Sequence, residues 1–261
     1  MKPGTAKLYR LHEKKIDAFS SVVLGLIAWE VIDYSLIRNP LVLVGPSRIA
    51  ASFFHLLFQG ELLRHIYATL VEFILGYLVG VVIGIGVGVL MGISRTAKQI
   101  LNPWVTISYN APVILLAPLF IIALGVGLVS KVTIVFIGAV FPVLFNTYAG
   151  ITTVDGRLVE AVRAFGGTKL QVFTKVTAPS ALPLVMTGLR LSVGRAIVGA
   201  IISEFFGSKA GIGFLIAMAS EDLKTDEAFV GVILLALGGY LTFEVLKYAE
   251  RWIAPWYEFK V

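Results

Sequence analysis

Apolar stretches about as long as a membrane-spanning helix alternate with short polar intervals along this chain. A helix needs about 20 predominantly apolar residues to cross the hydrocarbon core of a bilayer, and six segments approach or exceed that length. They are residues 17–37, 65–92, 102–124, 130–150, 181–206 and 228–249. Residues 48–60 are apolar but too short to span, so they predict a helix lying in the membrane interface.

This pattern predicts an all-α integral membrane protein with six transmembrane helices. We expect residues 1–16 to form an N-terminal segment, residues 17–250 the transmembrane domain, and residues 251–261 a C-terminal tail. The composition agrees, because only 15% of the 261 residues are charged, whereas soluble domains carry roughly 25%. The chain has no cysteine and three scattered histidines, so we expect neither a disulfide nor a metal site.

Lysine and arginine predict the orientation, because cytoplasmic loops of membrane proteins are enriched in these residues. With the N-terminus inside, fourteen basic residues fall in cytoplasmic segments and six fall outside, Lys131 among them. Both termini are therefore expected in the cytoplasm, together with the polar interval at residues 154–183. We interpret the net charge of +6 as this asymmetry and not as a nucleic-acid surface.

The polar interval predicts two short helices joined by a Gly-Gly turn. Asp155 and Thr168 are suited to cap the two helices at their N-termini. Gly166 is suited to end the first helix in a left-handed conformation, which costs glycine little. Pro179 and Pro183 are expected to stop or redirect the chain. The predicted result is an amphipathic hairpin at the membrane surface; the alternative is an ordinary solvated loop.

The spacing within this hairpin resembles the EAA loop of ABC importer permeases. Glu160-Ala161-Val162 is followed after three residues by Gly166, and after nine more by Val176-Thr177-Ala178-Pro179. Glutamate, glycine and proline fall in register with the family pattern, and the other changes are apolar for apolar. The resemblance implies a cytoplasmic coupling helix between spans 4 and 5 that docks on an ATPase subunit. The residues implied in this coupling are Glu160, Ala161, Arg163, Gly166, Gly167 and Pro179.

Fragments along most of the chain are similar to the nitrate, sulfonate, taurine and bicarbonate branch of these permeases. Their order and spacing carry the resemblance, because each is weak alone. They are Trp29-Glu30, Gly45-Pro46-Ser47, Asn110-Ala111-Pro112, Ala117-Pro118-Leu119, Gly125-Val126-Gly127, Phe141-Pro142, Asn146-Thr147, Ser203-Glu204, Gly211-Ile212-Gly213 and Thr225-Asp226.

The resemblance implies a type I importer permease in a prokaryotic inner membrane. Such a permease forms a homodimer with a second copy. It works with two ATPase subunits, which bind ATP and Mg, and with an external substrate-binding protein. The implied substrate is an oxyanion such as nitrate, a sulfonate, taurine or bicarbonate. A small aromatic compound or vitamin precursor is the alternative, because the branch also contains importers of these.

Glycines recur every four residues in the second predicted span, at Gly76, Gly80, Gly84, Gly88 and Gly92. On a helix they form a smooth stripe against which another backbone can pack closely. Static helix packing is the plainer interpretation, and a seam that slides along the translocation path is the other.

Four polar residues within the predicted spans are candidates for the translocation path, because polar groups in a membrane interior are costly. Arg195 lies about 18 Å along the fifth span from Pro183. There it would either attract an oxyanion or pair with Glu204 or with carbonyl groups across the dimer. Glu204 is expected near the outer end, where it would either cap a gate or contact the loop at residues 207–227. Tyr109 and Asn110 complete the set, although core packing is the plainer role for Tyr109.

Several other interpretations fit the sequence less well. The chain has no G-x-x-x-x-G-K-[ST] loop, so we expect ATP to be hydrolysed by a partner and no cofactor to bind this chain. An ion-driven transporter would favour inverted repeats and buried acids, and we expect Glu30, Glu72 and Glu244 to lie at span ends. A DNA-binding hairpin would be tethered at both ends and carry a net charge of only +2.

Overall fold

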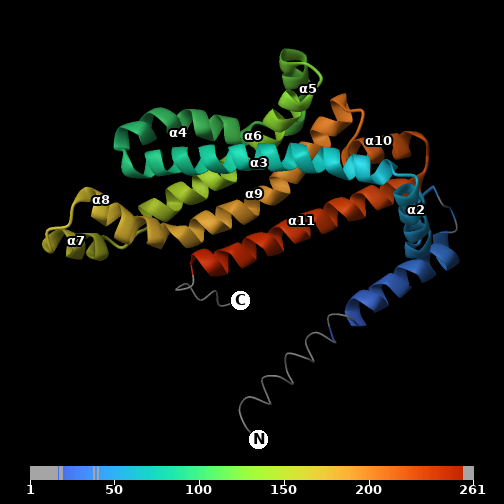
Figure 1. Ribbon diagram of the computed structural model, residues 1–261, viewed down its shortest axis with the longest axis horizontal. Coiled ribbons are helices and arrows are strands. Elements are labelled where there is room, and N and C mark those ends of the chain that lie inside the picture. The colour runs from blue at the N-terminus through green and yellow to red at the C-terminus, as the bar shows by residue number, and fades with distance from the viewer. Residues whose placement is uncertain (1–16, 18–19, 38, 40, 255–261) are drawn as a thin grey trace, which may run out of the picture. The chain divides into compact units, whose positions relative to one another are not determined.

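The computed structural model describes residues 17, 20–37, 39 and 41–254, and all regular structure within these residues is helical (Figure 1). The predicted N-terminal segment 1–16 and most of the predicted tail 251–261 lie outside the described residues. Residues 18–19 of the first predicted span lie outside them as well, whereas residues 20–32 are helical.

Four helical segments within the described residues are long and apolar enough to cross a membrane, and a bent pair makes a fifth. The four are α3 (Glu61–Ile93), α6 (Leu128–Thr152), the run Lys169–Gly207 that ends in α9 (Ala178–Gly207), and α11 (Thr225–Ile253). The bent pair is α4 (Arg95–Asn110) and α5 (Val113–Leu124). The shorter helices are α2 (Pro46–Phe58) and α10 (Ile212–Glu221).

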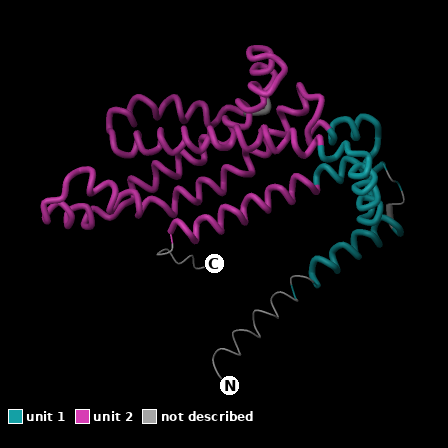
Figure 2. Tube along the Cα trace, in the orientation of Figure 1, with its two compact units in different colours: residues 1–63, 215–232 teal, residues 64–214, 233–261 magenta. Residues whose placement is uncertain are grey.

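The chain divides into two compact units (Figure 2). Unit 1 comprises residues 1–63 and 215–232, and its described part includes α2. Two acids upstream of α2 bind the N–H groups at its start. Asp33 accepts a hydrogen bond from the Gly45 N–H at 3.0 Å, and Glu30 accepts from the Ser47 N–H at 3.0 Å. These carboxylates satisfy donors that a helix start leaves unpaired, so Glu30 has a structural partner within unit 1.

Unit 2 comprises residues 64–214 and 233–261, and the glycine stripe of α3 sets its first packing interface. A Cβ atom built on Gly76 would lie 2.5 Å from Val135, on Gly80 2.7 Å from Ala139, and on Gly84 2.8 Å from the Val140 carbonyl oxygen. Gly88 and Gly92 repeat the relationship against Thr147 and Ile151. The two helices therefore run parallel in a constant register, with the close packing that small residues permit.

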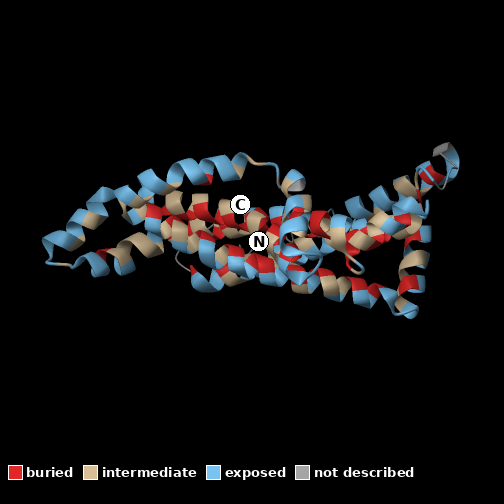
Figure 3. Cartoon of the chain, turned by 90° about the horizontal axis from the view of Figure 1, so that it is seen from above, coloured by how far each residue is buried: buried red, intermediate tan, exposed pale blue. Residues whose placement is uncertain are grey.

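Helix α6 also packs closely against α9, so it lies between two partners. Gly138 of α6 approaches the Arg195 backbone, and Gly199 of α9 approaches Ile134. Burial follows from this position, because 56% of the most apolar stretch of α6 is buried and only 11% of that of α11. Figure 3 shows the buried residues in red. The core of unit 2 is thus centred on α6.

The third predicted span is two helices and not one. Helix α4 and residues Leu115–Leu124 of α5 are bent by 108° across the break that contains Ala111-Pro112. The residue before a proline avoids the helical conformation, and Ala111 accordingly has an extended backbone with ψ 128°. The Asn110 side chain donates a hydrogen bond to the Thr106 carbonyl oxygen at 2.7 Å and so satisfies one acceptor at the end of α4.

The predicted hairpin is present, but its prolines do not end it. Helix α7 (Gly156–Ala164) leads through a turn into α8 (Lys169–Val172). A π-helical turn at Phe173–Thr177 then joins α8 to α9 without a break. In this turn the Ala178 N–H bonds five residues back, to the Phe173 carbonyl oxygen. Pro179 follows in the first turn of α9 within this continuous run, so the expectation that it redirects the chain was wrong.

Candidate functional site

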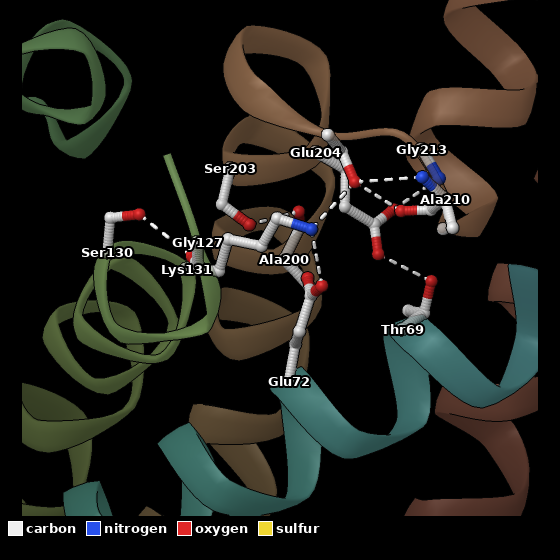
Figure 4. Close-up of polar contacts among 12 residues, drawn as sticks. Thr69, Glu72, Gly127, Ser130, Lys131, Ala200, Ser203, Glu204, Ala210 and Gly213 are labelled. Carbon is white, nitrogen blue, oxygen red and sulfur yellow. Dashed lines mark hydrogen bonds and ion pairs between the residues drawn. The ribbon is translucent and has the colours of Figure 1, made fainter. Parts of the chain in front are cut away.

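Glu204 is the centre of a buried polar cluster where α3, α6, α9 and the start of α10 meet (Figure 4). We call it the Glu204 cluster; its members are His65, Thr69, Glu72, Lys131, Glu204, Ser208, Gly211, Ile212 and Gly213. The Glu204 residue is 0% exposed. Its Oε1 accepts from the Thr69 hydroxyl at 2.5 Å, and its Oε2 accepts from the Gly213 N–H at 2.5 Å. The expected contact between Glu204 and the following loop is therefore present.

Three consecutive backbone N–H groups at the start of α10 each have a side-chain acceptor. The Gly211 N–H donates to His65 Nδ1 at 3.1 Å, and the Ile212 N–H donates to Thr69 Oγ1 at 2.7 Å. Glu204 takes the third, from Gly213. A helix start buried in a membrane protein must satisfy these donors internally. His65 and Thr69 are four residues apart on α3, so they lie on one face of that helix.

Glu72 lies in the same cluster and is buried within unit 2, whereas the sequence predicted an acid at a span end. Lys131 donates a hydrogen bond to Glu72 Oε1 at 2.6 Å and another to Ser208 Oγ at 2.6 Å. The side chains of Lys131 and Glu72 are 10% and 4% exposed. Lys131 was counted in an outer loop, but it lies in the first turn of α6. Its pairing continues the register of the glycine stripe one turn toward the start of α3.

Arg195 has a different partner from the one considered in the sequence. Its guanidinium donates to the Tyr109 hydroxyl at 3.0 Å and lies 4.8 Å from the centre of the Tyr109 ring. Tyr109 in turn packs edge-on against Phe141 and Phe145, with ring centres 6.0 and 5.1 Å apart. Arg195 remains exposed on the surface of unit 2. The structure thus brings Arg195 and Tyr109 together, close to the α4–α5 break, but leaves Glu204 in a separate cluster.

The hairpin presents polar and apolar side chains to solvent. Glu160, Ala161 and Arg163 of α7 are exposed, as are Phe165 at 94% and Leu170 at 71%. The predicted caps are present, because the Asp155 side chain accepts from the Arg157 N–H at 2.9 Å and Thr168 forms a reciprocal capping box with Gln171. Exposed aromatic and aliphatic side chains on a well-capped hairpin are typical of a surface that another protein covers.

The turn of the hairpin depends on both glycines. Gly166 has a φ of +79°, in the left-handed region that favours glycine. A Cβ atom on Gly167 would lie 2.5 Å from the Val162 side chain. The Gly166 and Gly167 N–H groups bond back to the carbonyl oxygens of Arg163 and Val162, both at 2.9 Å. The two glycines therefore close α7 in the manner predicted from the sequence.

Comparison with known proteins identifies the class. Residues 80–257 match the model of the binding-protein-dependent transport system inner membrane component. The chain belongs to this family. By its family it is an ABC importer permease subunit. Such a subunit is an inner-membrane component and is not itself an ATPase.

Curated relatives cover most of this permease. It is 35% identical to the putative aliphatic sulfonates transport permease protein SsuC of Bacillus subtilis, over 87% of this chain and 83% of the relative. It is 34% identical to the riboflavin transport system permease protein RibX of Chloroflexus aurantiacus, over 97% of this chain and 95% of the relative. A chain of the MetNI methionine ABC transporter shares its fold, with a TM-score of 0.65, 22% identity, and coverage of 73% of the permease and 95% of that chain.

Two ion pairs of the permease lie outside the Glu204 cluster. Lys247 and Glu244, three residues apart on α11, lie 3.3 Å apart. The Arg190 guanidinium pairs with Glu250 at 2.7 Å. No local signal connects residues 60 positions apart. The available signal was chemical, since Arg190 lies within a predicted span and Glu250 directly follows one, and ionisable groups in a membrane need a partner.

Proposed function

We propose that this permease forms the translocation path for a small oxyanion, with an aliphatic sulfonate as the leading substrate class. The observation that carries this proposal is the exposed guanidinium of Arg195, which lies 12 residues before the end of α9. That separation corresponds to about 18 Å of helix, close to the middle of a bilayer. A planar guanidinium forms paired hydrogen bonds with oxyanions. The sulfonate permease relative supports the same substrate class.

A small aromatic substrate is the second candidate. Tyr109, Phe141 and Phe145 form an aromatic group beside Arg195, and such rings favour flat aromatic ligands. The riboflavin permease relative points the same way. For either substrate class, we place Tyr109 and Asn110 along the translocation path, next to the α4–α5 break. We place Glu204 in the protein wall that supports the end of this path.

We further propose that a second copy of this chain completes the path. Two cytoplasmic ATPase subunits, which bind ATP and Mg, and an external substrate-binding protein complete the transporter. The Glu160 hairpin docks on the ATPase, with Phe165 and Leu170 as its apolar contacts. ATP-driven closure of the ATPases then moves the hairpins as rigid bodies and opens the path alternately to the two sides. This arrangement requires the hairpin and both termini in the cytoplasm, which reporter fusions at each terminus would test.

Transport in proteoliposomes with the cognate ATPase and binding protein tests the substrate proposal. We expect Arg195→Ala to reduce sulfonate uptake at least tenfold, and Arg195→Lys to retain part of it because the charge remains. Gly194→Ala is the matched control, because a Cβ atom there meets nothing within 4 Å. Unchanged uptake in Arg195→Ala would exclude the anion role. Uptake of flavin but not of sulfonate would favour the second candidate.

The coupling proposal has its own test. Glu160→Ala and Gly166→Leu should abolish substrate-stimulated ATP hydrolysis while the permease remains inserted. Gly156→Ala, in the same hairpin, should leave stimulation unchanged, because a Cβ atom there meets nothing within 4 Å. Normal stimulation in both Glu160→Ala and Gly166→Leu would contradict the coupling role, whatever the substrate.

A further inference from the structure

We propose that Glu72 and Glu204 share one proton within the Glu204 cluster, so that the buried cluster as a whole is neutral. The side chains of Glu72 and Lys131 are 4% and 10% exposed, and Glu204 is 0% exposed. Two carboxyl groups thus lie in the interior with a single ammonium group.

The Glu204 cluster contains two carboxyl groups and one ammonium group. If both carboxyl groups were ionised, the cluster would hold one uncompensated negative charge. A buried charge without a partner is strongly unfavourable in a protein interior, and more so in a membrane protein. Among the described residues, His65 also faces the cluster, and it accepts the Gly211 N–H at Nδ1. An acceptor nitrogen carries no proton, so His65 in this arrangement is neutral and supplies no positive charge.

Within the described part of the chain, the hydrogen bonds of the cluster leave one carboxyl oxygen without a donor. Glu72 Oε1 accepts from Lys131, whereas Glu72 Oε2 is buried and has no hydrogen-bond partner among the described residues. Both oxygens of Glu204 accept bonds, from Thr69 and Gly213. Figure 4 shows the Glu72 side chain extending from α3 toward Lys131 and Glu204. A proton held between the two carboxyl groups would supply the one donor that Glu72 Oε2 lacks.

A bound monovalent cation is the rival occupant, because it would also neutralise the cluster. The Lys131 ammonium already contacts Glu72 and Ser208, and its charge repels a second cation. The geometry therefore favours a proton, which needs no coordination shell.

Infrared spectroscopy of the transporter reconstituted in lipid tests the proposal near neutral pH. A protonated carboxyl group has a carbonyl band that shifts in heavy water. We expect this band in the wild-type protein, and its loss in both Glu204→Gln and Glu72→Gln. Glu250→Gln, which alters the other buried acid of unit 2, is the matched control and should retain the band. Wild-type protein without a band that either cluster variant removes would overturn the proposal.

A second measurement keeps the test valid if the variants fail to fold. Solid-state NMR of wild-type protein labelled at glutamate Cδ should show a protonated glutamic acid signal that persists when sodium and potassium are replaced by a bulky organic cation. A signal set with every glutamate ionised would overturn the proposal. Thermal stability that depends on sodium or potassium would instead identify a bound cation and would equally overturn it.

Discussion

Gly211 lies against Glu204 so closely that a Cβ atom on Gly211 would overlap the Glu204 carboxylate. Gly211 also has a φ of +133°, a conformation that residues with a side chain rarely adopt. A Cβ atom on Gly213 would lie 2.8 Å from Glu204 Oε2. The two glycines of the Gly-Ile-Gly sequence therefore leave the space that the Glu204 carboxylate occupies. This carboxylate also holds the turn between α9 and α10.

This relationship predicts that Gly211→Ala destabilises the permease by about 1–3 kcal/mol, the range for overpacking a well-packed site. Thermal unfolding in detergent or nanodiscs measures the effect. Gly238→Ala is the control, because a Cβ atom there meets nothing within 4 Å. Equal stability of the two variants would show that the turn relaxes freely around Glu204.

The glycine stripe predicts a position-dependent effect along a single helix. Gly84→Ala places a methyl group 2.8 Å from the Val140 carbonyl oxygen, so α3 and α6 must move apart and the variant should unfold at a lower temperature. Gly86→Ala, two residues along the same helix, meets nothing within 4 Å and should be neutral or slightly stabilising. Melting temperatures of the two purified variants measure the difference, and equal melting temperatures would contradict the packing interpretation.

The Arg190–Glu250 pair predicts strong coupling between α9 and α11. Glu250 is 2% exposed, and Arg190→Met leaves its carboxylate buried without its ionic partner. Loss of one member of a buried pair typically costs about 3–5 kcal/mol. The double variant Arg190→Met with Glu250→Met should recover much of that loss, because no charge remains to be buried. A double-mutant cycle measures the coupling energy, and additive effects would argue against a stabilising pair.

Asp155 predicts a pH-dependent hairpin. Its hydrogen bonds with the Arg157 side chain and backbone lower the pKa of Asp155 below the ordinary value of 3.8. A carboxylate whose pKa is depressed stabilises the folded hairpin above that ordinary value and loses this effect as the pH falls through the lowered pKa. Asp155→Ala should therefore raise amide exchange in α7 at neutral pH.

Asp155→Asn is the matched variant, because asparagine also caps helices but does not titrate. It should retain protection of α7 at neutral pH and lose the acid dependence. Hydrogen-exchange protection factors at pH 7 and pH 3 measure both effects. The same acid dependence in wild type and Asp155→Asn would assign it to another group.

Local features of the hairpin were predictable from the sequence because short-range chemistry sets them. The caps at Asp155 and Thr168 and the left-handed Gly166 depend on residues within one or two turns. The all-helical class and the family also followed from the chain alone, since hydrophobic length and motif spacing are linear properties. The break at Ala111-Pro112 was missed because residues 102–124 were predicted as one span from their apolar length.

The partners of the buried charges were decided only by the tertiary structure. Glu72 appeared to be an interfacial acid, and Lys131 a loop cation, until the parallel register of α3 and α6 placed them 2.6 Å apart. Arg195 was considered with Glu204, nine residues away on the same helix, but helical rotation points the two side chains to different neighbours. The sequence by itself determined which segments are helical and which residues are costly to bury in a membrane. Helix packing determined which partner each of these residues binds, because the partners lie on different helices.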